Sequence, residues 1–127
     1  MKVFNASGVR SESSEQITVF QFVNFKANQD ERYRNIFAVP NGGKRNAREA
    51  HNLKLQGVKA GVPDIAVMVP RDNYHGMFIE MKVGRNKPSQ FQIDMMKNLT
   101  NQNYKCIVCY SSQEAIKELG DYLGEKQ

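Results

Sequence analysis

The sequence predicts a single α/β domain in which a mixed central β-sheet is flanked by helices on both faces, with the element order α-β-α-β-β-α-β-α. Stretches whose apolar residues recur at helical intervals alternate with short apolar runs bounded by turn-forming residues, a pattern typical of helices interleaved with strands. The 127 residues are enough for one hydrophobic core but not for two. No repeat or linker divides the chain, so we expect one domain over 1–127 with a loose N-terminal leader over 1–12.

The first helix is expected to begin at Ser13, because Ser13 and Gln16 have the spacing of a capping box. Its helical periodicity is expected to fade in the polar stretch 28–35. The apolar positions that recur at helical intervals are Ile17, Phe20 and Val23. The short apolar run 36–39 follows, and it is predicted to be a strand because Pro40 ends it.

A second helix is predicted from Arg45 to Gln56, where helix-forming residues predominate and Gly57 supplies a stop signal. Two strands, 62–69 and 77–83, are then expected to form a hairpin. Ser89 with Gln92 has capping-box spacing and opens a third helix, whose predicted buried stripe contains Met95, Met96 and Leu99. The strand 104–110 follows. Ser111 with Glu114 opens the last helix, whose apolar residues are Ala115, Ile116, Leu119 and Leu123.

Composition narrows the class of protein. The net charge is +5 and the isoelectric point is about 9.3, an excess that fits a nucleic-acid partner. No apolar stretch approaches the roughly 20 residues that span a bilayer, and the N-terminus lacks the apolar core of a signal peptide. We therefore expect a cytoplasmic protein with no membrane partner. Cys106 and Cys109 are expected to be reduced thiols in a strand rather than zinc ligands.

An aspartate and a glutamate interrupt the two hairpin strands. If the turn is centred on Asp72, cross-strand partners have numbers that sum to 144, so Asp64 and Glu80 face each other with Cβ atoms roughly 5 Å apart. Lys82 lies two residues after Glu80, and the period of a strand places it on the same face. Like charges at such positions destabilise a sheet unless a proton, a cationic side chain or a metal ion intervenes.

Spacing alone leaves two interpretations of these three residues open. One is a salt bridge on a solvated sheet face, and the other is a site for a divalent cation. All-oxygen ligands favour Mg²⁺ or Mn²⁺ over zinc. With such a cation the set could hydrolyse phosphodiesters, with Lys82 orienting water or stabilising charge on the phosphate. The basic segments 42–48 and 82–87 flank the pair and could hold the DNA backbone. Their cations include Lys44, Arg45, Arg48, Arg85 and Lys87.

The sequence resembles a known nuclease family. Pro63-Asp64 followed by Glu80-Met81-Lys82 resembles the motif of PD-(D/E)xK nucleases, which have a restriction-endonuclease-like core. The stretches 14–22, 39–65, 76–92 and 114–123 resemble the VRR-NUC branch of that superfamily. The likeness covers nearly the whole chain from about residue 14.

The resemblance implies roles for several residues. It implies metal ligation by Asp64, Glu80 and the carbonyl of Met81, with Lys82 at the catalytic lysine position. Glu15 matches an acidic residue near the metals, although a charge in the first turn of a helix is a second explanation. Gln92 matches a glutamine beside the catalytic strand, a role compatible with capping. The turn formed by Asn41, Gly42 and Gly43 is expected to contact the substrate.

The compact members that this chain resembles are structure-selective endonucleases of phage or bacterial type, whose dimers act on branched DNA such as Holliday junctions. The resemblance therefore implies a homodimeric, metal-dependent endonuclease. Two alternatives remain open at this point. One is a nickase, flap nuclease or end-processing nuclease, and the other is a basic DNA-binding module without cleavage activity.

Overall fold

The computed structural model describes residues 10–40 and 45–125. Its elements follow the predicted order, with one short 3₁₀ helix added after the first helix. They are α1 (Glu12–Lys26), η1 (Glu31–Asn35), β1 (Ile36–Ala38), α2 (Ala47–Leu55), β2 (Ile65–Val67), β3 (Gly76–Met81), α3 (Gln90–Asn101), β4 (Tyr104–Cys109) and α4 (Ser112–Tyr122). The prediction of the fold class is confirmed, although most strands are shorter than expected.

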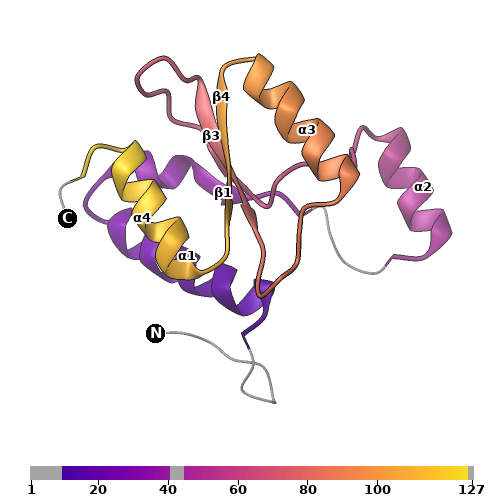
Figure 1. Ribbon diagram of the computed structural model, residues 1–127, viewed down its shortest axis with the longest axis horizontal. Helices are drawn as coiled ribbons and strands as arrows, with labels where there is room; N and C mark the ends of the chain where they lie inside the picture. Colours follow the sequence, from indigo (N-terminus) through magenta and orange to yellow (C-terminus); the bar gives the residue numbers. More distant parts are fainter. Residues whose placement is uncertain (1–9, 41–44, 126–127) are drawn as a thin grey trace.

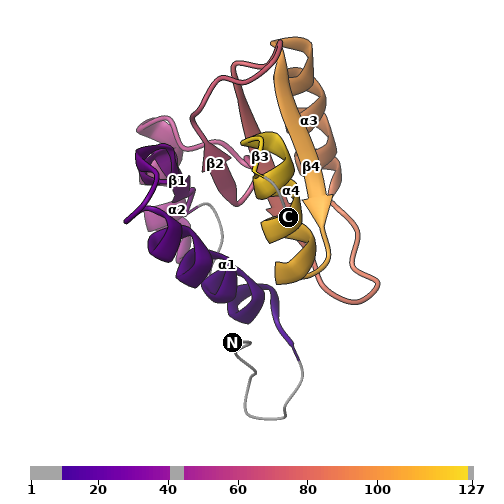
Figure 2. The same ribbon diagram turned by 90° about the vertical axis from the view of Figure 1, so that its left-hand side faces the viewer.

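The strands form one mixed sheet in the order β1-β2-β3-β4. β1 with β2 and β2 with β3 are antiparallel, whereas β3 and β4 are parallel. A parallel pair requires a crossover, and α3 provides it. Figures 1 and 2 show α1 and α4 on one face of the sheet and α3 on the other. The sheet is therefore covered by helices on both faces, as predicted.

The hydrophobic core lies between the sheet and the α1–α4 layer. Met77, Ile79 and Met81 of β3 are fully buried there, and Val19 of α1 and Leu119 of α4 pack in the same cluster. Because side chains alternate along a strand, Phe78 and Glu80 of β3 point to the opposite face, which α3 covers. The acidic position is thus on the α3 face of the sheet.

The start of α1 differs from the prediction. Ser11, rather than Ser13, is the N-cap, and it forms a capping box with Ser14. The helix therefore begins within the predicted leader 1–12. Residues 1–9 lie outside the described part of the chain. Ile17, expected on the apolar face, is 49% exposed. The buried face of α1 is instead partly polar, because it contains Ser14, Glu15 and Thr18 beside Val19 and Val23.

The helices on the α3 side bury less surface than expected. Met95, Met96 and Leu99 of α3 are only half-buried. No residue of α2 is buried, and α2 stands beside α3 at the periphery of the molecule (Figure 1). Local signals define its ends: Asn46 is the N-cap and accepts from the Glu49 N–H, and Gly57 has a positive φ of 101° just beyond its end. The remaining predicted caps, Ser89 and Ser111, are both observed.

The two thiols are free, as predicted. Cys109 is buried in the core, and desolvation, with Glu114 and Glu118 adding to it, raises the pKa of its thiol to about 12. Cys106 is half-buried, and its pKa is also raised by burial. Thiols with raised pKa values are poor nucleophiles and poor metal ligands. None of the helices in the described ranges is long and apolar enough to cross a bilayer.

Candidate active site

The hairpin has the predicted register. Ile65 pairs with Ile79 and Val67 pairs with Met77, so each pair of numbers sums to 144. Extended by one position, the same register places Asp64 opposite Glu80. Asp64 lies just before β2, where its carbonyl oxygen accepts from the Val39 N–H at 2.7 Å. Its side-chain Oδ2 accepts from the Met81 N–H of β3 at 2.8 Å. Asp64 is thus fixed by backbone groups on both neighbouring strands.

Glu80 is held in an almost closed environment. It is 1% exposed, although it is a charged residue in a central strand. Its Oε2 accepts from Gln92 Nε2 at 3.0 Å, and Lys82 Nζ lies 3.6 Å from the same oxygen. Its Oε1 is buried without a hydrogen-bond partner. The salt bridge between Lys82 and Glu80 is therefore present, but the sheet face on which it lies is not solvated, because Glu80 is buried.

Burial and charge shift the titration of Glu80. Desolvation is the largest cause and the neighbouring Asp64 adds to it, so the pKa of Glu80 rises from 4.5 to about 7. Lys82 opposes this rise because its ammonium group favours the ionised form of Glu80. Two carboxylates near one another, one of them buried, form a site that either a proton or a cation can stabilise.

This shift predicts how the stability of the metal-free protein depends on pH. An acid whose pKa is raised on folding stabilises the folded state fully below its unfolded pKa, and this contribution is lost as the pH rises through its folded pKa. The free energy of unfolding should therefore fall by on the order of 1–3 kcal/mol between about pH 5 and pH 8. Urea unfolding in EDTA at several pH values measures it. In Glu80→Gln this part of the pH dependence should disappear, and an unchanged slope would contradict the assignment.

Gln92 joins the site to the start of α3. Its side-chain Oε1 accepts from the Ser89 N–H at 2.8 Å, and Ser89 Oγ accepts from the Gln92 N–H at 3.3 Å, which completes the capping box. The same side chain donates from Nε2 to Glu80. The predicted capping role and the predicted place beside the catalytic strand therefore coexist, and the cap fixes the amide that reaches the carboxylate.

Gly61 is a positioning residue that the sequence analysis did not single out. It lies between α2 and Asp64, has φ of 87°, and packs directly against the first turn of α3. A β-carbon there would lie 2.5 Å from the carbonyl carbon of Phe91 and 3.0 Å from the backbone nitrogen of Gln92. This close approach aligns the segment before Asp64 with the helix turn that carries Gln92. The Ala60-Gly61-Val62-Pro63 sequence indicates a turn but cannot show that distant contact.

Gly61→Ala should therefore destabilise the protein more than Gly57→Ala does. Both glycines have positive φ, but a β-carbon at Gly57 would meet nothing within 4 Å. Gly57→Ala should cost about 1–2 kcal/mol from backbone strain alone, and Gly61→Ala should cost about 1–3 kcal/mol more from the backbone collision. Chemical denaturation of the two variants measures this difference. Equal losses of stability would contradict the packing described for Gly61.

Glu15 is buried, but its hydrogen-bond partners are not residues of the Asp64–Glu80 site. Its Oε1 accepts from the Ser112 N–H at 2.9 Å, at the start of α4, and Arg10 Nη1 lies 3.3 Å from the same oxygen. Its Oε2 has no partner. Within the described residues, no three His, Cys, Asp or Glu side chains gather as a metal-binding group, so the structure does not bring Glu15 together with Asp64 and Glu80. Glu15 lies in the first turn of α1, as the second explanation has it, and its carboxylate also accepts at the N-terminus of α4.

The pair Asp64 and Glu80 nevertheless fits a hard divalent cation. Magnesium is commonly held by one or two carboxylates, with waters and substrate phosphates completing its shell. The buried, unpartnered Oε1 of Glu80 is an oxygen of the required kind. Met81, whose carbonyl is the expected further ligand, lies between Glu80 and Lys82 and is already joined to Asp64 through its N–H.

The residues predicted to contact DNA are only partly described. Arg45, Arg48, Arg85 and Lys87 are exposed, and Arg45 Nη2 donates to the Pro40 carbonyl at 3.3 Å. The other four, Asn41, Gly42, Gly43 and Lys44, lie outside the described residues. Arg85 and Lys87 follow Lys82 directly in the loop between β3 and α3. The four described cations are thus open to solvent, and their contact with DNA stays a prediction.

Comparison with known proteins gives a family match and a structural match. The VRR-NUC domain family matches residues 6–113. A solved structure described as a VRR_NUC domain protein superposes with a TM-score of 0.71 at 25% sequence identity, over 87% of this chain and 88% of that chain. No curated protein matches the sequence. The fold and most of the sequence thus agree with one family.

Proposed function

The chain belongs to the VRR-NUC family, and from that premise we propose that it is a metal-dependent DNA endonuclease acting as a homodimer on branched DNA such as four-way junctions. A nuclease-type function in DNA processing follows from the family itself. The cofactor, Mg²⁺ or Mn²⁺, and the preference for branched DNA are the specific parts of the proposal.

One observation carries the chemistry. Asp64 and Glu80 meet at the ends of β2 and β3, and Glu80 is 1% exposed with one oxygen unpaired. A buried carboxylate beside a second carboxylate costs free energy, so the pair needs a compensating proton or cation. A module that only bound DNA would gain nothing from two carboxylates that repel phosphates. A divalent cation relieves this repulsion and at the same time attracts the phosphodiester.

The side chains around the pair have complementary tasks. When bound, the cation supplies Lewis acidity toward a phosphoryl oxygen and activates water for attack. Asp64 is oriented by the Met81 N–H, and Glu80 is oriented by Gln92 Nε2. Lys82 Nζ, 11% exposed as a side chain and 3.6 Å from Glu80, is placed to orient the attacking water or to stabilise charge that develops on the phosphate.

The same arrangement supports a two-site enzyme. One set of Asp64, Glu80 and Lys82 cuts one strand, so paired incisions in a four-way junction need two sets related by symmetry. A homodimer supplies them without further residues. The excess of positive charge, +5 over the chain, favours a substrate that presents phosphates from several arms.

Cleavage of labelled DNA tests the proposal. Four-way junction, flap and linear duplex of matched sequence are incubated with Mg²⁺, Mn²⁺ or EDTA, and the oligomeric state is measured by analytical ultracentrifugation. We expect symmetric cuts in the junction that EDTA abolishes and a dimer in solution. Cutting of flaps or linear ends alone would keep the chemistry and reject the junction. Binding with no cleavage in either metal would identify a DNA-binding module instead.

A further inference from the structure

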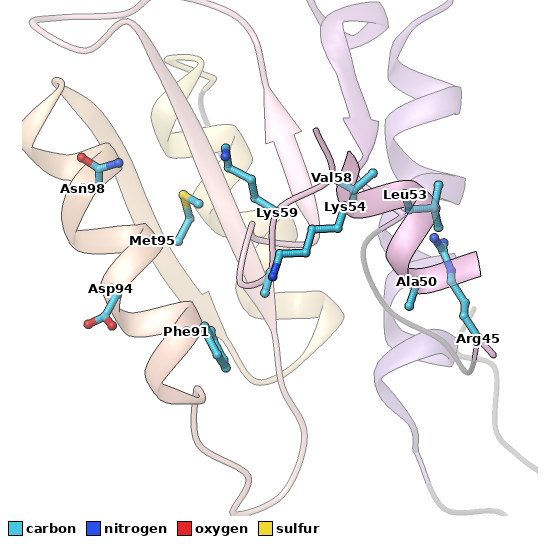
Figure 3. Close-up of a pocket in the computed structure, with 11 residues that line it drawn as sticks. Arg45, Ala50, Leu53, Lys54, Val58, Lys59, Phe91, Asp94, Met95 and Asn98 are labelled. Carbon is cyan, nitrogen blue, oxygen red and sulfur yellow. The ribbon is translucent and has the colours of Figure 1, made fainter. Parts of the chain in front are cut away.

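A groove of about 880 Å³ lies between α2 and α3, beside the candidate active site. Figure 3 shows Phe91 and Met95 on α3 facing Lys54 and Lys59, which come from α2 and the segment after it. Its volume lies in the range of roughly 300–1,000 Å³ that is usual for ligand sites. None of the residues assigned above to catalysis lines it, so the groove is a separate feature.

The groove combines an exposed aromatic ring with positive charge. Phe91 is 69% exposed, although it is a large apolar side chain in the first turn of a helix. Among the described residues, three cationic ones also line the groove, and they outnumber the acidic residue of its wall, Asp94. The three are Arg45, Lys54 and Lys59. Gln90 Nε2 donates to Asp94 Oδ1 at 2.8 Å, which fixes that side chain on α3. A ring with surrounding cations is the combination that binds a nucleic-acid strand through its bases and phosphates.

The groove and the active site are formed in part by consecutive residues. Phe91 directly precedes Gln92, which donates to Glu80. Ala60, in the groove wall, directly precedes Gly61, whose backbone packs against Phe91. The first turn of α3 and the segment before Asp64 therefore each place one residue in the groove wall and the next residue at or beside the site.

We propose that this groove binds an unpaired strand of the DNA substrate, with a base stacked on Phe91 and phosphates held by Lys54 and its neighbouring cations. The inference rests on the proposed nuclease function and names the substrate class more closely, as branched DNA whose strand next to the cut is unpaired, as it is where base pairs open at a branch point. In a duplex the faces of the interior bases are covered by their neighbours, so away from the duplex ends an aromatic ring stacks on an unpaired base. Asp94 and Asn98, on the α3 wall, offer polar groups for a base edge.

Binding of DNA in EDTA tests this inference, because no metal-dependent cut is needed for it. The probes are a blunt duplex and the same duplex with a single-stranded extension, one probe for each polarity. Phe91→Ala should weaken binding of at least one extended duplex by about tenfold or more and leave the blunt duplex within about twofold. Phe91→Trp should restore the affinity. Phe25→Ala is the matched control, because Phe25 on α1 is 62% exposed and lies outside the groove.

Lys54→Gln provides a second, independent variant. It should lower the slope of log affinity against log salt by about 0.7 for the extended duplex and leave the slope for the blunt duplex unchanged. Lys117→Gln, an exposed lysine of α4, should alter neither slope.

The possible outcomes separate this inference from the proposed function. If Phe91→Ala caused equal losses of affinity for blunt and extended duplexes, or no loss, the groove would not be the binding site of an unpaired strand. The nuclease proposal would be unaffected. A change in oligomeric state with Phe91→Ala would also overturn the inference, because the groove would then bind a second copy of the chain. Failure of the intact chain to bind either DNA would overturn the proposed function as well.

Discussion

Asp64→Asn is expected to slow DNA cleavage by on the order of a thousandfold while the protein remains folded. The asparagine oxygen can still accept from the Met81 N–H, so the hydrogen bond that orients residue 64 is kept. The substitution removes one of the two charges that attract the cation. A loss of several kcal/mol of transition-state stabilisation corresponds to a rate reduction on the order of a thousandfold. Single-turnover cleavage with saturating Mg²⁺ or Mn²⁺ measures it.

Asp64→Asn, which slows cleavage, should make the metal-free protein more stable. At about pH 8 and without metal, Asp64 and Glu80 repel one another, because the charge of Asp64 contributes to the raised pKa of Glu80. Asp64→Asn removes this repulsion and should raise the Tm in EDTA, whereas Mg²⁺ should raise the Tm of the unmodified protein and not that of the variant. Asp72→Asn, in the exposed hairpin turn, is the control. A Tm response to Mg²⁺ that survives in Asp64→Asn would place the cation elsewhere.

Lys82→Met is expected to reduce the rate of the cut by about a hundredfold or more and to change DNA affinity by only a few-fold. The ammonium group lies in the site, 3.6 Å from Glu80 Oε2, rather than on the open surface, so its loss acts on charge that develops during the reaction. Lys82 also opposes the rise in the pKa of Glu80. Its removal should raise that pKa further and move the rising limb of the pH–rate profile to higher pH.

Two other lysines make this result specific. Lys87→Met, in the exposed loop before α3, should weaken binding and reduce its salt dependence more than it slows the cut. Lys117→Met, whose partner is Asp121 on the surface of α4, should affect neither quantity. If Lys82→Met weakened binding as much as it slowed cleavage, Lys82 would be an anchor for phosphate rather than a catalytic residue.

The sequence was sufficient to predict the centre of this molecule. Met77, Ile79 and Met81 must all face the core, so alternation excludes a slip by one residue, and a turn centred on Asp72 then gives the observed pairing. The Ser89–Gln92 capping box was also visible, because both of its bonds are local. These features depend on short spacings in the chain.

Features that depend on tertiary packing were not predictable in the same way. Ile17 has the helical spacing of a core residue and is exposed, because the face of α1 turned inward contains Glu15, which accepts from the distant Ser112. Gly61 looks like an ordinary turn residue, and only its contact with Phe91 reveals its role. The groove was missed for the same reason, since it joins α2 to α3 across the intervening hairpin.

The exposed helix α2 has a kinetic consequence. It has nine residues and no buried side chain, and isolated helices shorter than about 12–15 residues are marginal in water. Its amide protons should therefore exchange with solvent through local unfolding, far faster than those of β3, whose exchange requires the core to open. A DNA strand bound against α2 would stabilise this helix and so couple its folding to substrate binding. Protection of individual α2 amides from exchange would then measure how far the groove is occupied.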